Sequence, residues 1–542
     1  MRAAAASDLW WKNAVVYCLD VETFSDSDGD GCGDVAGLIE RIHHVAELGA
    51  SCVWLMPLYP SPNCDDGYDI SDYLGVDPRL GDLSDVVEAI RHASDRGLRV
   101  LADLVVNHTS IEHPWFVAAR ESRESPFRDY YVWTDDPAGE AGTARENWTW
   151  DERAGQFYLH RFAPFQPDLD ITNPAVRERI AKTVGFWLAL GVSGFRMDAV
   201  PFLCEETGAS DVETGSGKRW LHALREYAGR RRGDAVLMGE VNVGAGEIAS
   251  YFEDHGDALH LQLGFLINQR LWLSLARGEA APLEDLIRTL PVPPPDAGWA
   301  IFLRNHDELT LDKLEATERD EVFAAFAPRE EMRIYGHGIR RRAASMLGGD
   351  GPRLRLAWSL TLALAGTPVI LYGDEIGMGE DLELEGRMSV RTPMQWEPGP
   401  AGGFSEAAPE ALVRPLVGGA LGPDRVNVAD QRRDAGSLLR FVSRLVHQRR
   451  DTPEIGLGRT TLIENEPPEL FAQRSDWEGS TVLTVHNLSE RRVRAELDLG
   501  EDVDGVDDLL ELREHRVDRG RLHVDLDGYG YLWLRAVRSA GA

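Results

Sequence analysis

The sequence contains little cysteine and no long hydrophobic run. Five cysteines in 542 residues are too few and too scattered for a disulfide framework, and none forms a CxxC pair or lies beside histidine at zinc-ligand spacing. No apolar run reaches about 18 residues, the length that crosses a bilayer, and the N-terminal text MRAAAASDLWWKN lacks the apolar core of a signal peptide. These absences predict a soluble protein in the reducing environment of the cytoplasm. The cysteines are Cys18, Cys32, Cys52, Cys64 and Cys204.

Positive charge is also scarce. The chain has 57 Lys and Arg residues against 90 Asp and Glu residues, which gives a formal net charge of −33. A surface with this excess of carboxylates repels nucleic-acid phosphates and anionic lipid headgroups. We therefore expect no nucleic-acid partner, no membrane partner and a small neutral substrate. The sequence contains no coiled-coil pattern, and it leaves open whether the chain forms a homo-oligomer.

Eight short apolar runs recur along the chain, separated by amphipathic segments such as 34–50 and 82–97. Runs that are apolar on both faces and alternate with helices are typical of parallel sheets. Eight such units predict a closed (β/α)₈ TIM barrel rather than an open sheet. The runs are 14–21, 51–57, 98–106, 194–200, 235–241, 260–265, 299–307 and 367–375.

The uneven spacing of these runs predicts additions to the barrel. Residues 109–170 are rich in tryptophan, proline and charge and predict a subdomain inserted after strand 3, while long excursions fall at about 308–355 and 376–433. Beyond residue 455 the text changes to short alternating segments, which predict a C-terminal antiparallel β-sandwich domain. The predicted domains are the barrel (1–108 and 171–454), the inserted subdomain (109–170) and the C-terminal domain (455–542).

Several runs end in polar residues, which are catalytic candidates at the C-terminal ends of barrel strands. Among them, the carboxylates Asp198, Glu240 and Asp307 suit glycosyl transfer, which needs a nucleophile, a proton donor and negative charge near an oxocarbenium-like centre. Arg196 lies two residues before Asp198, so both side chains face the same side of a strand, and we expect the guanidinium to keep Asp198 ionised. Phosphoryl transfer or metal-assisted hydrolysis uses similar carboxylates, but no GxxxxGK[ST] or HExxH motif supports either.

Four motifs resemble the signature regions of the α-amylase family, glycoside hydrolase family 13. They are DLVVNHT (103–109), GFRMDAV (194–200), GEVN (239–242) and FLRNHD (302–307). QPDLD (166–170) and GTPVILYGDEIGM (366–378) resemble the family's accessory regions. The resemblance implies a retaining double displacement on α-glucosides, and that mechanism requires nucleophile and acid carboxyls about 5–5.5 Å apart.

The resemblance also implies a role for each matching residue. Asp198 resembles the family's nucleophile, Glu240 its general acid/base and Asp307 the third carboxylate, which holds hydroxyls of the distorted sugar. The residues that match those around the sugar at the −1 subsite are Arg196, His108 and His306, and Asp103 matches a supporting carboxylate.

Two further motifs resemble the exo-acting branch of the family, which contains α-glucosidases, oligo-1,6-glucosidases and trehalose synthases. They are DDGYDISDY (65–73) and RTPMQW (391–396). The resemblance implies that Asp65 pairs with Arg391 and closes the pocket beyond the terminal glucose, and that Tyr68 stacks on this glucose. The alternative interpretation makes Arg391 an ordinary surface salt-bridge residue.

Three segments, 302–314, 332–350 and 372–380, most resemble trehalose synthases, which isomerise maltose to trehalose inside a pocket that excludes water. Asn242 matches a residue that helps to close that pocket. The chain departs from the pattern at Asp312, where these enzymes usually carry Glu, and in YCLDVETF (17–24), which stands in place of YQLHV-type text. These departures leave two alternatives open: an exo-acting α-glucosidase that hydrolyses α-1,4 or α-1,6 bonds of short oligosaccharides, or a transglucosylase with another acceptor. An inactive sugar-binding scaffold is a third hypothesis, against which the intact carboxylates argue.

The segment DSDGDGCGD (26–34) predicts a calcium loop, because it packs four aspartates around glycines. It is not an EF-hand, since its twelfth position is Gly37 rather than a bidentate Glu. It resembles the calcium loop near the first strand of this branch, which implies a structural Ca²⁺, and oxygen-only ligands favour that ion. A solvated acidic turn is the alternative, and we expect no organic cofactor. The implied ligands are Asp26, Asp28, Asp30, Asp34 and, through its backbone carbonyl, Cys32.

Overall fold

Eight parallel strands close into a barrel in the computed structural model, which describes residues 9–139, 144–204, 216–252, 257–464, 467–501, 503–511 and 513–538. Their order around the barrel is β1-β14-β10-β9-β8-β7-β3-β2. Each strand overlaps one of the apolar runs, so the predicted TIM barrel is confirmed. The strands are β1 (Val16–Leu19), β2 (Cys52–Leu55), β3 (Arg99–Leu104), β7 (Gly194–Met197), β8 (Val236–Gly239), β9 (Leu261–Leu263), β10 (Gly298–Phe302) and β14 (Thr367–Leu371).

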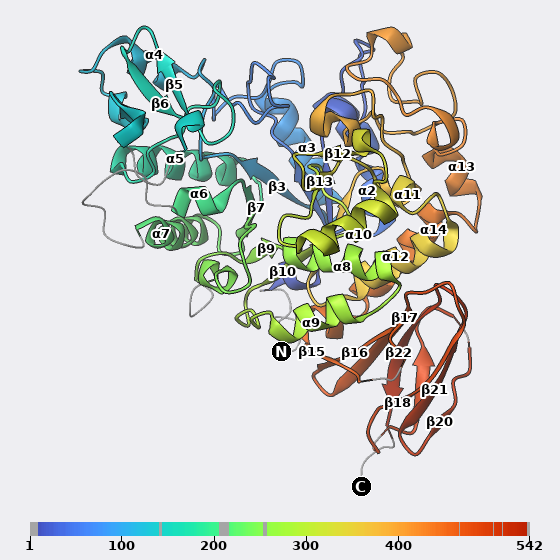
Figure 1. The fold of residues 1–542 in the computed structure, drawn as a ribbon. Helices are drawn as coiled ribbons and strands as arrows, with labels where there is room; N and C mark the ends of the chain where they lie inside the picture. Colours follow the sequence, from blue (N-terminus) through green and yellow to red (C-terminus); the bar gives the residue numbers. More distant parts are fainter. Residues whose placement is uncertain are drawn as a thin grey trace.

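Helices pack around these strands, and their ends follow from local sequence (Figure 1). The first of them, α2 (Val35–Leu48), starts where the Asp34 side chain accepts a hydrogen bond from the Gly37 backbone, and it ends at Gly49, whose φ of 98° suits glycine. The other long helices are α3 (Leu83–Asp95), α5 (Pro174–Leu190), α7 (Ser216–Arg231), α8 (Phe265–Arg277), α9 (Ala281–Thr289), α12 (Gly351–Ala363) and α14 (Leu438–Arg450). The short helices α6 (Val200–Cys204) and α15 (Pro453–Leu457) complete this part.

The inserted subdomain after β3 contains a small antiparallel sheet of order β4-β6-β5. Its elements are α4 (Pro114–Glu121), β4 (Trp133–Thr134), β5 (Trp148–Asp151) and β6 (Gln156–Leu159). Its aromatic residues form its core: the Phe116 ring lies 4.9 to 5.5 Å from the rings of Tyr131, Trp133 and Tyr158. The predicted insertion is therefore present, while its boundaries stay predictions.

Two long excursions follow β10 and β14. The first contains a three-stranded sheet of order β11-β13-β12, built from β11 (Leu309–Thr310), β12 (Arg333–Ile334) and β13 (Gly338–Ile339), together with α10 (Ala316–Phe326) and α11 (Ala343–Met346). The second is mostly irregular, with short turns of 3₁₀ helix such as Gly386–Val390, and ends in α13 (Val428–Arg433).

The C-terminal domain is a pair of antiparallel sheets that enclose an apolar core around Leu470, Leu483, Leu497 and Leu522. One sheet has the order β15-β16-β17-β22-β19 and the other β18-β21-β20. The strands are β15 (Arg459–Leu462), β16 (Leu470–Trp477), β17 (Ser480–Asn487), β18 (Val493–Asp498), β19 (Gly505–Asp508), β20 (Val517–Asp518), β21 (Arg521–Leu526) and β22 (Tyr531–Val537). The predicted antiparallel β-domain is confirmed.

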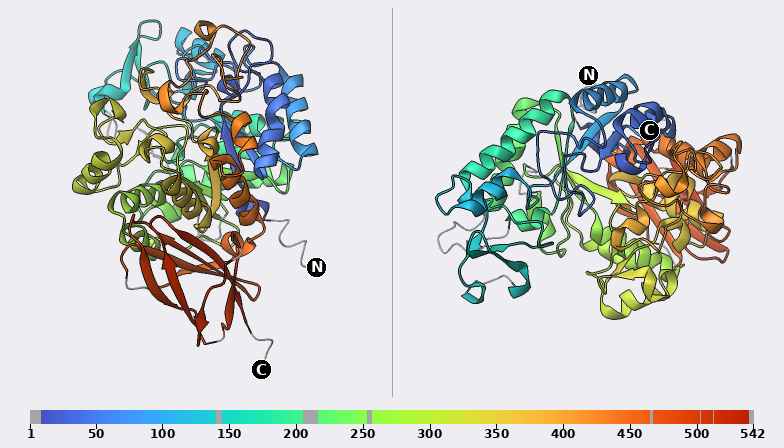
Figure 2. Two further views of the ribbon diagram at one scale, coloured as in Figure 1. Left: turned by 90° about the vertical axis from the view of Figure 1, so that its right-hand side faces the viewer. Right: turned by 90° about the horizontal axis from the view of Figure 1, so that it is seen from above.

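This domain lies at the end of the barrel opposite the inserted subdomain (Figure 1 and the left view of Figure 2). It contacts the barrel through α12, where the indole nitrogen of Trp533 donates to Ser359 Oγ at 2.9 Å and His486 lies 3.0 Å from the same hydroxyl. Within the described ranges, every helix is too short or too polar to cross a bilayer.

Candidate active site

The predicted catalytic residues lie together at the C-terminal ends of the barrel strands. Asp103 is the penultimate residue of β3, and Arg196 lies in β7 with Asp198 just after this strand. Glu240 follows β8, and Asp307 lies beyond the end of β10. Asp103 and Arg196 are register partners on neighbouring strands, which places their side chains next to each other.

The Arg196 guanidinium is the centre of this arrangement, and its side chain is 1% exposed. It donates to Asp103 Oδ1 and to Asp198 Oδ1 at 2.8 Å each, and to Glu240 Oε2 at 2.5 Å. Asp198 and Glu240 therefore contact the two terminal nitrogens of the same guanidinium. The two carboxyls are therefore neighbours on one guanidinium.

Burial sets the pKa values of these two carboxyls. Burial raises the pKa of Asp198 to about 6, with contributions from Asp103 and Asp307, although Arg196 and a hydrogen bond with Glu240 act in the opposite direction. The prediction that Arg196 favours the ionised form is right in direction, but burial outweighs it. Burial also raises the pKa of Glu240 to about 7, against Arg196 and together with Asp198 and Asp307. At neutral pH, Asp198 is therefore mainly ionised while Glu240 still carries a proton for much of the time.

Asp307 has a different environment, because two arginines contact the same oxygen. Arg387 and Arg391 each donate to Asp307 Oδ1 at 2.7 Å, and His306 Nε2 lies 3.2 Å from Oδ2. Burial opposes ionisation of Asp307, but His306, Arg387 and Arg391 outweigh it and hold the pKa of Asp307 well below its ordinary value. Asp307 is thus a permanent anion at the base of the pocket.

The predicted ion pair between Asp65 and Arg391 is wrong. Asp65 pairs with Arg387 at 2.7 Å, whereas Arg391 pairs with the next residue, Asp66, at 2.5 Å. The reason is depth: the Arg391 side chain is fully buried and meets Asp66 inside the protein, while Arg387 is 25% exposed and meets Asp65 at the surface. The alternative of a surface salt bridge for Arg391 is wrong for the same reason.

Two aromatic residues and an amide complete the wall. The Tyr68 hydroxyl lies 2.7 Å from His306 Nε2 and donates to Asp103 Oδ2 at 3.1 Å, and the rings of Tyr68 and His306 are parallel. His108 Nε2 lies 3.1 Å from the side-chain nitrogen of Gln166, which also donates to Asp65 Oδ2 at 2.9 Å. Three residues of the site were not predicted from the sequence: Gln166, Arg387 and Asp66. Each lies in one of the motifs quoted above or within four residues of one.

Comparison with protein families agrees with this geometry. The family described as the α-amylase catalytic domain matches residues 20–322 and 329–458, and the sucrose hydrolase-like C-terminal domain matches residues 479–535. The chain belongs to the α-amylase family.

Known members of the α-amylase family resemble this chain over most of its length. A trehalose synthase/amylase from Mycobacterium tuberculosis is 38% identical over 551 residues, which cover 98% of this chain and 91% of the relative. A trehalose synthase from Thermus thermophilus is 42% identical over 491 residues, which cover 89% of this chain and 50% of the relative. The solved structure of an isomaltulose synthase from Protaminobacter rubrum superposes with a TM-score of 0.77 at 26% identity, covering 97% of this chain and 99% of the other.

In this α-amylase family member, Asn242 lies two residues after Glu240 and contacts Asp312. The Asn242 side-chain nitrogen donates to both oxygens of Asp312, at 3.3 and 3.2 Å. Gln269 and Thr310 also donate to Asp312, and Lys313 pairs with it at 2.8 Å. The buried Asn242 Oδ1 has no hydrogen-bond partner among the described residues.

The acidic loop of this α-amylase family member brings Asp26, Asp28 and Asp34 together, with one oxygen from each within 4.8 Å of the others. Backbone amides hold the loop: Asp26 accepts from Asp28, Gly29 and Gly31, and Asp30 accepts from Cys32. Three carboxylates around one point are a donor set that fits Ca²⁺. Asp30 and Cys32 lie in the same loop outside this group of three.

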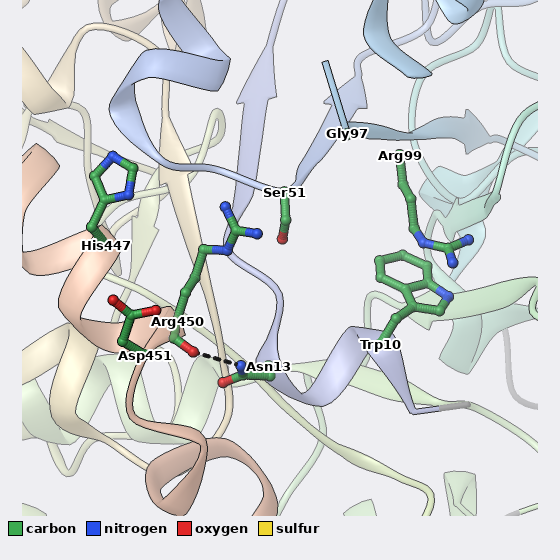
Figure 3. A pocket seen from close by; sticks show the side chains of 8 residues that line it. All are labelled: Trp10, Asn13, Ser51, Gly97, Arg99, His447, Arg450 and Asp451. Atoms are coloured by element: carbon green, nitrogen blue, oxygen red, sulfur yellow. Dashed lines mark hydrogen bonds between the residues drawn. The ribbon is translucent and has the colours of Figure 1, made fainter. Parts of the chain in front are cut away.

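A cavity of about 450 Å³ lies at the other end of the barrel, where the strands begin. Asn13, Ser51 and Gly97 line it at the entrances to β1, β2 and β3, and the end of α14 contributes His447, Arg450 and Asp451 (Figure 3). Asn13 is held by a 2.9 Å bond to the Arg450 carbonyl. Because active sites of TIM barrels lie where the strands end, this cavity is separate from the catalytic residues.

Proposed function

We propose that this chain isomerises maltose to trehalose by intramolecular glucosyl transfer. The observation that carries the proposal is the group of three carboxylates held by arginines: Asp198 and Glu240 contact Arg196, and Asp307 contacts Arg387, which also pairs with Asp65. We infer that these residues line a pocket that the pair of Arg387 and Asp65 closes. Such a pocket admits one sugar end, which favours disaccharides over long chains. Trehalose synthases among the relatives support the choice of substrate and product.

The reaction has two steps. In the first, the Glu240 carboxyl gives its proton to the glycosidic oxygen while Asp198 attacks the anomeric carbon, which breaks the maltose bond and forms a glucosyl ester. In the second, the released glucose turns, its anomeric hydroxyl attacks the anomeric carbon of the glucosyl group held on Asp198, and Glu240 takes the hydroxyl proton back. The Asp198 ester bond breaks, and two inversions give an α-linked product.

Isomerisation requires the released glucose to react before water does. The contact between Asn242 and Asp312 supports this, because Asn242 lies two residues after Glu240 and its side chain is held in place by Asp312. The ion pair of Arg387 with Asp65 also supports it. Together they restrict the pocket around the ester.

Hydrolysis is the second candidate function, and one observation favours it. The bonds of Asn242 to Asp312 are long, at 3.2 and 3.3 Å, and Lys313, Gln269 and Thr310 compete for the same carboxylate. Such a contact is easily opened to water. Exo-acting α-glucosidase activity, with glucose as the product, is the expected side reaction.

We further propose that the loop holds one structural Ca²⁺, with Asp26, Asp28 and Asp34 as carboxylate ligands and the Asp30 carboxylate and Cys32 carbonyl as further oxygens. The ion would fix the loop that leads from β1 into α2, and it takes no part in catalysis. We also propose a cytoplasmic location, which the free thiols of Cys18, Cys32, Cys52 and Cys64 support.

Incubation with maltose tests the proposed reaction. Trehalose and free glucose are quantified over time, with Asp198→Asn as the inactive control. Trehalose in excess over glucose supports isomerisation, whereas glucose alone contradicts it and favours the hydrolase. A third glucosylated product would indicate transfer to another acceptor.

A further inference from the structure

Three acidic side chains converge below the glucose pocket, away from the catalytic group. One oxygen each from Asp20, Glu22 and Asp66 lies within 4.8 Å of the other two, and all three side chains are buried. The cation among them is Arg414, whose side chain is 7% exposed. Arg414 lies 3.3 Å from Asp20 and 2.7 Å from Glu22, and it also pairs with Asp66. The guanidinium therefore takes the place that a metal ion would occupy in such a cluster.

Arg414 is connected to Asp307 through three ion pairs in series. Asp66 accepts a hydrogen bond from Arg414 at Oδ1 and one from Arg391 at Oδ2, so each of its carboxylate oxygens is held by an arginine. Arg391 in turn donates to Asp307 Oδ1 at 2.7 Å and to the His306 carbonyl at 2.9 Å. Arg414 also donates to the backbone carbonyl of Arg391 at 2.8 Å, which gives it a second hold on the same residue.

The backbone at Asp66 is compatible with this position. Its φ is 53°, in the left-handed region that Asn and Asp adopt more readily than other side chains. The Asp66 side chain lies between Arg391 and Arg414 and contacts both. The two arginines thus fix Asp66, and Asp66 fixes the direction of the Arg391 guanidinium.

The same cluster explains the unusual end of the first strand. YCLDVETF supplies Asp20 and Glu22, which pair with Arg414 from a segment about 390 positions later. Arg79 holds Glu22 from its other side at 2.5 Å. Asp20 and Glu22 are therefore the anchor for Arg414.

We propose that Arg414, anchored by Asp20 and Glu22, is a positioning residue for the glucose pocket. Arg414 holds Asp66, and Asp66 in turn keeps Arg391 against Asp307. The inference rests on the proposed function, because it takes Asp307 to bind the sugar. It adds a specificity determinant that touches no substrate.

Three variants separate positioning from a purely structural role. Arg414→Met removes the cation, Arg414→Lys keeps the charge without the planar fork, and the triple variant Asp20→Asn, Glu22→Gln, Arg414→Met removes the cation with its two anchors. Arg425→Met is the matched control, because it changes an exposed arginine of the same excursion. The readouts are the unfolding temperature, binding of the monosaccharide inhibitor deoxynojirimycin by calorimetry, and kcat and KM for p-nitrophenyl α-glucoside.

We expect Arg414→Met to weaken inhibitor binding by about 10-fold or more and to raise KM by a similar factor, since a buried ion network loses its cation. Arg414→Lys should restore part of the affinity. The triple variant should regain most of the unfolding temperature but not the affinity, because Asp66 still lacks its second arginine. Arg425→Met should bind like the wild type.

The proposal would be overturned if the triple variant bound the inhibitor within about 2-fold of the wild type. Each tenfold of affinity is about 1.4 kcal/mol, so the link from Arg414 to Asp307 would then contribute almost no binding free energy. Where Arg414→Met does not fold, the triple and lysine variants give the same decision. A wild-type chain that cleaves the glucoside but makes no trehalose would contradict the proposed isomerisation and leave this test intact.

Discussion

Arg387 and Asp65 form a 2.7 Å ion pair at the surface of the glucose pocket, although 322 positions separate them in the chain. The other arm of the same guanidinium reaches Asp307 at 2.7 Å. One side chain therefore joins a surface loop after β2 to the base of the pocket. In the proposed function, this bridge limits the pocket beyond the terminal glucose.

Replacement of Arg387 should open that end of the pocket. We expect Arg387→Ala to raise KM for maltose by about 10-fold, since an interaction with the bound sugar's surroundings is lost, and to raise the share of glucose among the products. Product analysis and initial rates measure both effects. Arg329→Ala, an exposed arginine of the neighbouring excursion, is the control and should change KM by less than about 2-fold. An unchanged KM in Arg387→Ala would contradict the assigned closure.

The activity should depend on pH through two carboxyls. The rate needs Asp198 ionised, so it should fall on the acid side as pH drops below the Asp198 pKa of about 6. It needs Glu240 protonated, so it should fall on the alkaline side as pH rises above the Glu240 pKa of about 7. A profile of kcat/KM against pH should therefore be bell-shaped with its maximum between these values. Glu240→Gln should lose the alkaline limb, and activity that keeps rising above neutral pH would refute the assignment.

The contact of Asn242 with Asp312 should set the ratio of the two products. Asp312→Ala removes the partner of the Asn242 amide, so we expect roughly 3-fold more glucose per trehalose because water enters the pocket more often. Asp312→Glu, one methylene longer, should reach Asn242 more closely and shift the ratio toward trehalose. The highly exposed Glu330→Ala serves as the control. Equal product ratios in all three variants would show that this contact does not control water.

Chelation tests the proposed calcium loop. An ion present at about 100 times its dissociation constant stabilises the folded state by about 2.7 kcal/mol, so its removal should lower the unfolding temperature by several degrees. Metal analysis should give one calcium per chain. In Asp28→Asn, chelation should no longer lower the unfolding temperature and metal analysis should find no calcium. Asp320→Asn, which changes an exposed aspartate in α10, should behave like the wild type in both measurements. An unfolding temperature that ignores chelation would favour the solvated acidic turn.

The sequence was most informative where burial dictates pattern. Barrel strands are apolar on both faces, so runs such as 194–200 and 235–241 located β7 and β8, and the polar residues at their ends identified Asp198 and Glu240. Apolar and polar residues alternate in the C-terminal segments that predicted a β-domain, and these segments form β17, β18, β21 and β22. β15, β16, β19 and β20 lacked so clear a pattern and were not predicted individually.

Side-chain pairing was beyond the reach of the sequence. Asp65 and Asp66 are adjacent, and Arg387 and Arg391 lie four residues apart, so no local pattern says which aspartate meets which arginine. The outcome depends on how deeply each loop is buried. Arg414 carried no signal at all, because its partners at the end of β1 lie at the other end of the chain.

The excursion between residues 376 and 433 delivers Arg387, Arg391 and Arg414, while the loop after β2 delivers Asp65 and Asp66 as their counter-charges. Neither loop is electrostatically complete alone. Chimeras that exchange only one of them between relatives would leave buried charges stranded. Engineering of this scaffold should therefore exchange the two loops together, as a single unit.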